Sequence, residues 1–166
     1  MGFDSRFDRS SGVGASNTHK AVRKSPHLLL QKRTEREKPL VPYVKPFEGN
    51  EATELGNEEE PSIIRWGAKK SGVVVTDTDP STLRHPAHGF IFATVDAVGI
   101  SPWNGEKTVC EAKLVGIGPH HDWGAPSDGW EALPYKVQCQ IAIQMAVHDT
   151  DEGARAGVGG RDQAVL

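Results

Sequence analysis

The sequence predicts an α+β fold, or a small mixed α/β sheet flanked by helices, formed as one domain by residues 1–150. The main observation is a change of hydrophobic period along the chain, from helical spacing to strand-like runs and back to helical spacing. Hydrophobic residues make up 37% and charged residues 25% of the 166 residues, which is typical of a globular protein. No apolar run approaches the roughly 20 residues of a bilayer span, so no membrane association is expected.

The first third of the chain predicts short helices and a long connection. Ser16-Asn17-Thr18 offers N-cap side chains for a short helix over residues 17–24. Pro26 suits the first turn of a second short helix that includes residues 28–30. Residues 34–50 contain three prolines, and we expect them to form a connecting loop.

The middle of the chain predicts one long helix followed by three strands. Residues 51–70 are expected to be helical, with Pro61 kinking the helix or marking a restart. Strands are expected at Val73–Val75, Gly89–Asp96 and Lys107–Val115, because these runs are rich in β-branched and aromatic residues.

The last part predicts a tight turn, a helix and a tail. Asn104-Gly105 lies between the last two strands and is a strong hairpin signal. After Pro134 the spacing is helical, and one face carries Val137, Ile141 and Met145. Residues 151–166 are rich in glycine and show no periodicity, so an irregular tail is expected.

Charge is divided unevenly along the chain. Residues 1–47 carry ten Lys and Arg against four Asp and Glu, whereas the remaining residues carry nine against eighteen. A basic front and an acidic back suit a protein that holds a polyanion with one part and metal cations with the other. A solvated basic face explains the same numbers.

A constellation of charged residues follows from the predicted hairpin. If the chain turns at Asn104-Gly105, Asp96 lies opposite Lys113 and diagonal to Glu111. Glu111 and Lys113 share one face of their strand, and Cys110, Ala112 and Leu114 point into the core. Carboxylates beside an ammonium suit phosphodiester hydrolysis, because Mg²⁺ binds carboxylate oxygens and activates water, and a lysine stabilises developing charge.

Two plainer alternatives exist for these residue types. An isolated Glu-x-Lys is most often a surface ion pair. His120-His121 together with Cys110 and Cys139 suggests zinc, but structural zinc sites use closely spaced ligand pairs and these cysteines lie far apart in sequence. Two cysteines are better explained as small core residues in an intracellular, reducing compartment.

Four motifs in order resemble the YqaJ-type viral recombinase family, to which the lambda exonuclease is related. They are Arg9-Ser-Ser-Gly-Val-Gly-Ala-Ser16, the helical segment Gly56-Asn-Glu-Glu-Glu60-Pro-Ser-Ile, Phe90–Asp96 followed by Cys110-Glu-Ala-Lys113, and Tyr135-Lys-Val-Gln138-Cys-Gln140. The resemblance runs from about Arg9 to Met145, over more than four-fifths of the chain.

The resemblance implies a restriction-endonuclease-like core of the PD-(D/E)xK superfamily and Mg²⁺-dependent 5′-to-3′ digestion of duplex DNA ends, with Mn²⁺ as an alternative cation. The single strands would pass to an annealing protein, in the cytoplasm of a bacterium that carries the phage. Relatives form ring-shaped trimers, so a homo-oligomer is expected. Relatives also continue past the glutamine helix with further strands and a helix, which residues 151–166 are not expected to supply.

The resemblance also assigns roles to residues. Asp96, Glu111 and the more distant Glu60 would hold the metal, with the carbonyl of Ala112 as an additional ligand. Lys113 would assist the nucleophilic water, and Gln138 is favoured over Gln140 as the glutamine of the site. Arg9 and Ser16 would hold the DNA 5′-phosphate, although a plain N-cap is the common role of such a serine.

Three functions remain open from the sequence. The first is an active exonuclease. The second is an inactive, truncated protein that binds DNA ends, and the third is an endonuclease of the same superfamily.

Overall fold

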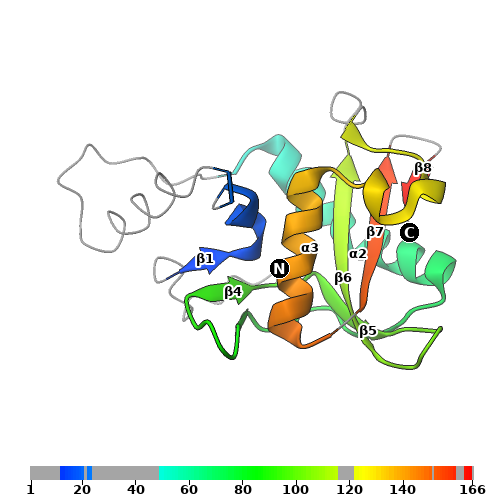
Figure 1. The fold of residues 1–166 in the computed structure, drawn as a ribbon. Helices are drawn as coiled ribbons and strands as arrows, with labels where there is room; N and C mark the ends of the chain where they lie inside the picture. Colours follow the sequence, from blue (N-terminus) through cyan, green and yellow to red (C-terminus); the bar gives the residue numbers. More distant parts are fainter. Residues whose placement is uncertain are drawn as a thin grey trace.

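The structure is a computed structural model that describes residues 12–20, 22–23, 49–115 and 122–150, and the backbone of 152–159 and 163–165. Its strands form a three-stranded sheet with the order β1-β4-β3 and a five-stranded sheet with the order β2-β5-β6-β7-β8 (Figure 1). In the described part of the chain, no helix combines the length and the apolar character needed to cross a membrane.

The five-stranded sheet is centred on the hairpin of residues 97–115. It contains β2 (Val74–Asp77), β5 (Ala97–Ile100), β6 (Lys107–Val115), β7 (Glu152–Gly159) and β8 (Gln163–Val165). β5 pairs with β6 and β2 in antiparallel fashion, whereas β7 lies parallel to β6. The sheet is therefore mixed, and β6 is its buried middle strand.

Capping residues set both ends of the long helix α2 (Glu51–Ser71). The side chain of Asn50 caps the helix by accepting a hydrogen bond from the N–H of Thr53 at 3.0 Å. Gly72 ends it in the left-handed conformation, with φ of 76°. The helix does not restart at Pro61, which lies inside it. Its first half is largely exposed, so the hydrogen bond that proline removes is lost next to solvent.

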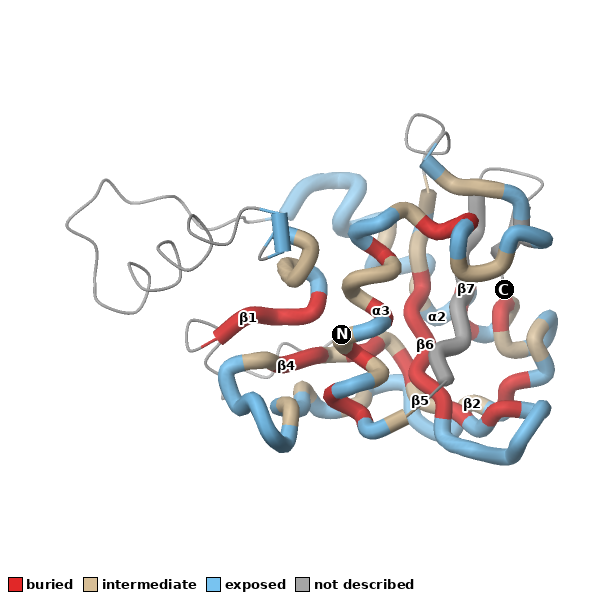
Figure 2. The backbone as a smooth tube through the Cα atoms, in the orientation of Figure 1, coloured by how far each residue is buried: buried red, intermediate tan, exposed pale blue. Residues whose placement is uncertain are grey.

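The helices α2 and α3 (Tyr135–His148) cover opposite faces of the five-stranded sheet. Ile63 and Ile64 of α2 pack against Cys110 and Ala112 of β6. Side chains of α3 instead hydrogen-bond to Glu111, which points to the other face because successive strand side chains alternate. Figure 1 shows α3 in front of the sheet and α2 behind it, and Figure 2 shows the buried segments of β6 between them.

The smaller sheet holds the N-terminal segment against the core. It consists of β1 (Val13–Gly14), β3 (Leu83–Arg84) and β4 (Ile91–Ala93), and β1 runs parallel to β4. The 3-10 helix η2 (Ala15–Asn17) follows β1. Gly12 is required where β1 approaches β4, because a Cβ there would lie 2.0 Å from the carbonyl oxygen of Phe90.

Several predicted elements are confirmed, and others need correction. The long helix, the strand over residues 107–115 and the helix after Pro134 agree with the structure, as do α-helical residues at 18–20 and 22–23. The expected strand Gly89–Asp96 is a strand only at Ile91–Ala93, because the chain leaves one sheet there and enters the other. Leu114 was expected in the core but is 42% exposed.

The C-terminal segment differs from its prediction, and part of the N-terminal prediction stays untested. Residues 151–166 were expected to be irregular, but 152–159 and 163–165 form β7 and β8. The open edge of β6 supplies backbone hydrogen bonds to this glycine-rich segment, whose apolar residues are mostly small. The predicted short helix over residues 28–30 and most of the predicted loop at 34–50 lie outside the described residues.

Candidate active site where the two sheets meet

Asp96 lies at the point where the chain passes between the sheets. It ends the link between β4 and β5, and its backbone N–H donates to the carbonyl of Cys110 at 3.2 Å. Its carboxylate is partly buried and accepts a hydrogen bond from the N–H of Ala112 at 2.7 Å. The carboxylate therefore lies against the middle of β6, and its residue directly precedes the first residue of β5.

The register of the hairpin differs from the prediction by two residues. Ala97 pairs with Cys110, which places Asp96 beside Glu111 and not opposite Lys113. The reason is the turn: Ser101 pairs with Glu106 through an N–H to carbonyl bond of 2.8 Å, so the loop is longer than Asn104-Gly105 alone. The correction brings the two carboxylates closer together than the sequence indicated.

Glu111 is the most heavily contacted member of the site. Its side chain is buried, with 3% exposed. Its Oε1 accepts from Lys113 Nζ in an ion pair and from Gln140 Nε2 at 2.5 Å. Its Oε2 accepts from Gln144 Nε2 at 2.5 Å. Three donors from β6 and α3 thus fix a buried carboxylate in one orientation.

The burial of Asp96 next to another acid makes its negative charge unfavourable. Burial and the charge of Glu111 raise the pKa of Asp96 to about 8, although Lys113 acts in the opposite direction. For Lys113, burial favours the neutral amine, but the charges of Glu111 and Asp96 dominate and its pKa is raised. The site therefore contains two carboxyl groups that oppose each other's ionisation and one ammonium.

Glu60 lies on α2 and is influenced by the same charges. Burial and then Glu111 raise the pKa of Glu60. Its own charge also contributes to the raised pKa of Asp96. In the described part of the chain, however, no group of three or more His, Cys, Asp and Glu side chains is placed to hold a metal ion. Glu60 is therefore coupled to the pair through its charge.

The chemistry of the pair nonetheless fits a hard divalent cation. A buried and a partly buried carboxylate that resist simultaneous ionisation gain stability from a positive charge between them. The N–H of Ala112 points to Asp96, and the N–H and carbonyl of one strand residue point to the same side. The carbonyl of Ala112 therefore also faces the Asp96 side of β6, where it is available as a third oxygen ligand.

Of the two residues predicted to bind the DNA 5′-phosphate, the structure describes Ser16 alone. Ser16 lies within η2 with its side chain exposed, and Gly14 rather than a serine is the N-cap residue. Its neighbour Ala15 packs against Ala93 of β4 and Val147 of α3, so Ser16 is held beside the elements that carry the site. Arg9 lies outside the described residues.

The structure brings a different pair of glutamines to the site than the sequence suggested. Gln138 donates to the carbonyls of Trp130 and Leu133, at 3.2 and 2.9 Å, and so joins α3 to η4 (Pro126–Ala132). Gln140 and Gln144, four residues apart on one face of α3, donate to Glu111. The sequence analysis favoured Gln138 over Gln140 as the glutamine of the site and did not identify Gln144. The available signal was a polar i, i+4 pair on a helix whose neighbouring positions are apolar.

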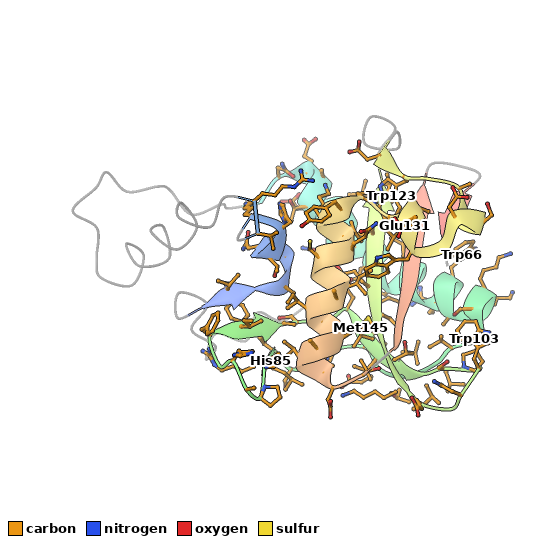
Figure 3. All side chains as sticks on the ribbon, viewed as in Figure 1. Trp66, His85, Trp103, Trp123, Glu131 and Met145 are labelled. Atoms are coloured by element: carbon orange, nitrogen blue, oxygen red, sulfur yellow. The ribbon has the colours of Figure 1, made fainter. Side chains whose placement is uncertain are left out.

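The zinc alternative finds no support among the described residues. Burial and the charge of Asp96 raise the pKa of Cys110 to about 11, so its thiol is protonated and packs in the core. His120 and His121 lie outside the described part of the chain. Trp123 and Trp130 pack against Leu133, Val137 and Ile141, and Figure 3 shows Trp123 beside the start of α3.

Comparisons with known proteins agree with this geometry. The model of the YqaJ-like viral recombinase domain matches residues 7–152. The crystal structure of LHK-Exo in complex with dAMP matches with a TM-score of 0.66 and 18% identity, over 93% of this chain and 73% of that one. The structure of the alkaline exonuclease LHK-Exo from Laribacter hongkongensis gives 0.65 and 19%, with the same coverage. A search of curated proteins gives no match.

These likenesses confirm the fold expected from the sequence, a mixed sheet with flanking helices and a restriction-endonuclease-like core. The family match spans most of the 166 residues and includes Asp96, Glu111 and Lys113. The chain therefore belongs to the family of the YqaJ-like viral recombinase domain.

Proposed function

We propose that the protein is a metal-dependent nuclease that digests duplex DNA from its ends in the 5′-to-3′ direction, as part of phage-type recombination. The observation that carries the proposal is the carboxylate pair of partly buried Asp96 and buried Glu111, with the ammonium of Lys113 bound to Glu111. Family membership supports the connection with recombination, and the neighbour of the same fold is named an alkaline exonuclease.

Each residue of the site has a role that follows from its contacts. Asp96 and Glu111 would hold Mg²⁺ or Mn²⁺ together with the Ala112 carbonyl, with Glu60 supplying further negative charge. When bound, the cation supplies activation of water and stabilisation of charge on the phosphate oxygens. Lys113 places a fixed positive charge at Glu111, where it orients the attacking water and offsets charge developing at the phosphorus.

Attack from a 5′ end requires a site that holds the terminal phosphate. Ser16 is exposed on η2, and the packing of Ala15 against Ala93 and Val147 connects this segment to the elements around Glu111. We propose that Ser16 and Arg9 bind the 5′-phosphate and so determine the direction of digestion. The product would be a 3′ single strand, the substrate of an annealing protein.

Polarity is tested with a linear duplex that is 5′-phosphorylated at both ends and carries one radioactive label. A label at the 5′ end should be released early in Mg²⁺, and a label at the 3′ end should be released only after the strand is consumed. EDTA should prevent both. Early release of the 3′ label instead would contradict the proposed direction while leaving the nuclease activity intact.

A DNA-end-binding protein without turnover is the second candidate. The observation that favours it is the lack, among described residues, of a third acidic side chain placed with Asp96 and Glu111. This candidate predicts salt-sensitive binding to duplex ends and no product in Mg²⁺. Release of nucleotides by the wild-type protein eliminates it.

A further inference from the structure

Gln144 of α3 connects the two chain segments that carry the acidic residues. Its side chain is fully buried, with 0% exposed. Its Nε2 donates to Glu111 Oε2 at 2.5 Å and to the backbone carbonyl of Thr94 at 3.0 Å. Thr94 lies two residues before Asp96. One amide nitrogen therefore joins the strand that presents Glu111 to the segment that presents Asp96.

The orientation of this amide is determined by its partners. If the amide were reversed, its oxygen would face two acceptors, the Glu111 carboxylate and the Thr94 carbonyl, and both contacts would be repulsive. In the observed orientation Gln144 Oε1 is buried and has no hydrogen-bond partner among the described residues. An apolar side chain of similar size would fill the position without this cost, so packing alone does not explain a glutamine here.

The contacts of Glu111 show what the glutamine achieves. An ionised carboxylate offers about four acceptor positions on its two oxygens. Lys113 and Gln140 donate to Oε1, whereas Gln144 is the described donor to Oε2. The side chain is thus held on both sides, and Oε2 keeps an acceptor position that these donors do not occupy.

We infer that Gln144 is a positioning residue for the carboxylate pair, which orients Glu111 and fixes the approach of the Asp96 segment so that both acids can bind one divalent cation. The inference rests on the proposed function in requiring a cation at this site. Gln144 itself neither binds the cation nor touches DNA; it acts through Glu111 and Thr94.

The test compares Gln144→Met with Ile141→Ala in the full chain. Methionine keeps the length and volume of glutamine but removes the donor. Ile141 is buried on the same helix, 1% exposed, and packs against Leu133 and Val137, so its truncation weakens the core without a polar change. Mn²⁺ binding is measured by calorimetry without DNA, and nucleotide release is measured against both Mn²⁺ and DNA concentration.

For Gln144→Met we expect Mn²⁺ binding weaker by about 10- to 100-fold, the range found when partners of metal ligands are removed. The kcat should fall and the KM for DNA should stay unchanged, because DNA contacts are untouched. Ile141→Ala should lower thermal stability and leave Mn²⁺ affinity as in the wild type. Wild-type Mn²⁺ affinity in folded Gln144→Met protein would overturn the inference.

The inference and the proposed function fail separately. Wild-type protein that binds Mn²⁺ but releases no nucleotide removes the nuclease proposal, and the calorimetric comparison still decides the role of Gln144. Wild-type protein that binds no Mn²⁺ overturns both. If Gln144→Met does not fold, the side-chain amide protons of Gln144 are followed by NMR in the wild type. They should be slow to exchange and should shift on addition of Mg²⁺; unshifted signals overturn the inference.

Discussion

At the scale of single residues, the charge of Asp96 determines how the site responds to pH and to cations. Burial, and then the charge of Glu111, raise its pKa from 3.8 to about 8. Around neutral pH the carboxyl group is therefore largely protonated in the cation-free protein. Ionisation becomes favourable only when the pH rises or when a positive charge enters the site.

The first prediction concerns stability in EDTA. Between the unfolded pKa, near 3.8, and about 8, folded Asp96 holds a proton that the unfolded chain releases. The free energy of unfolding should therefore fall as the pH rises through this range. Asp96→Asn removes the titrating group and should flatten this part of the profile. Urea unfolding of both proteins at about pH 5 and about pH 9 makes the comparison; equal pH profiles would contradict the raised pKa.

The second prediction concerns cation binding. Because a cation must displace the proton from Asp96, Mg²⁺ affinity should increase as the pH rises toward and through about 8. Calorimetry in buffers of different ionisation enthalpy should detect proton release below this pH. Binding that releases no proton at neutral pH would show that Asp96 is already ionised or takes no part.

At the scale of elements, the N-terminal segment is joined to the site through one close backbone contact. Gly12 approaches Phe90 so closely that a Cβ would lie 2.0 Å from its carbonyl oxygen. The next residue, Val13, donates its N–H to the same oxygen at 2.7 Å. The position of Ser16 relative to β4 thus depends on a glycine four residues earlier.

The third prediction follows from this contact. Gly12→Ala should separate β1 from β4, lower the free energy of unfolding by roughly 1–3 kcal/mol and weaken binding of 5′-phosphorylated ends. Gly56→Ala is the matched control, because a Cβ at Gly56 meets nothing within 4 Å. In the helix interior this control should be neutral or stabilising by up to about 1 kcal/mol. Gly12→Ala with wild-type stability and end binding would show that the contact is not needed.

Local sequence patterns predicted the positions of the main helices and of β6 well, but they predicted the pairing of β6 with β5 in the wrong register. Asn50 and Gly72 mark the ends of α2, and the β-branched run of residues 107–115 matches β6. The register error arose because an Asn-Gly turn signal does not specify how many residues precede the turn in the loop. Gln144 was missed for a related reason: its importance comes from Glu111 and Thr94, which are distant in sequence and meet it only in the fold.

At the scale of the whole molecule, the C-terminal segment forms strands that its sequence pattern did not predict. In β7 the apolar residues at alternate positions are mostly small (Ala154, Ala156, Val158), yet β7 lies parallel to β6 from Thr108 to Val115. Backbone hydrogen bonds at an open sheet edge accept almost any non-proline sequence. The family match ends at residue 152, so this strand lies almost entirely beyond the matched region.

The fourth prediction distinguishes exonuclease from endonuclease action by the whole protein. A protein that starts at a 5′ end should leave covalently closed circular duplex DNA intact and should degrade the same DNA after it is linearised. Both substrates are compared by gel electrophoresis with equal Mg²⁺ and protein. Conversion of closed circles to nicked or linear forms would indicate the endonuclease alternative.

The measurement that tests the central claim most directly is nucleotide release from linear duplex DNA in Mg²⁺ by wild-type protein and by Lys113→Ala. Lys113 supplies the fixed positive charge at Glu111, and its side chain is 35% exposed, so its loss should affect chemistry more than folding. We predict release by the wild type and a loss of at least about 100-fold in the variant, with retained thermal unfolding. Equal release by the two folded proteins would contradict the assignment of this site.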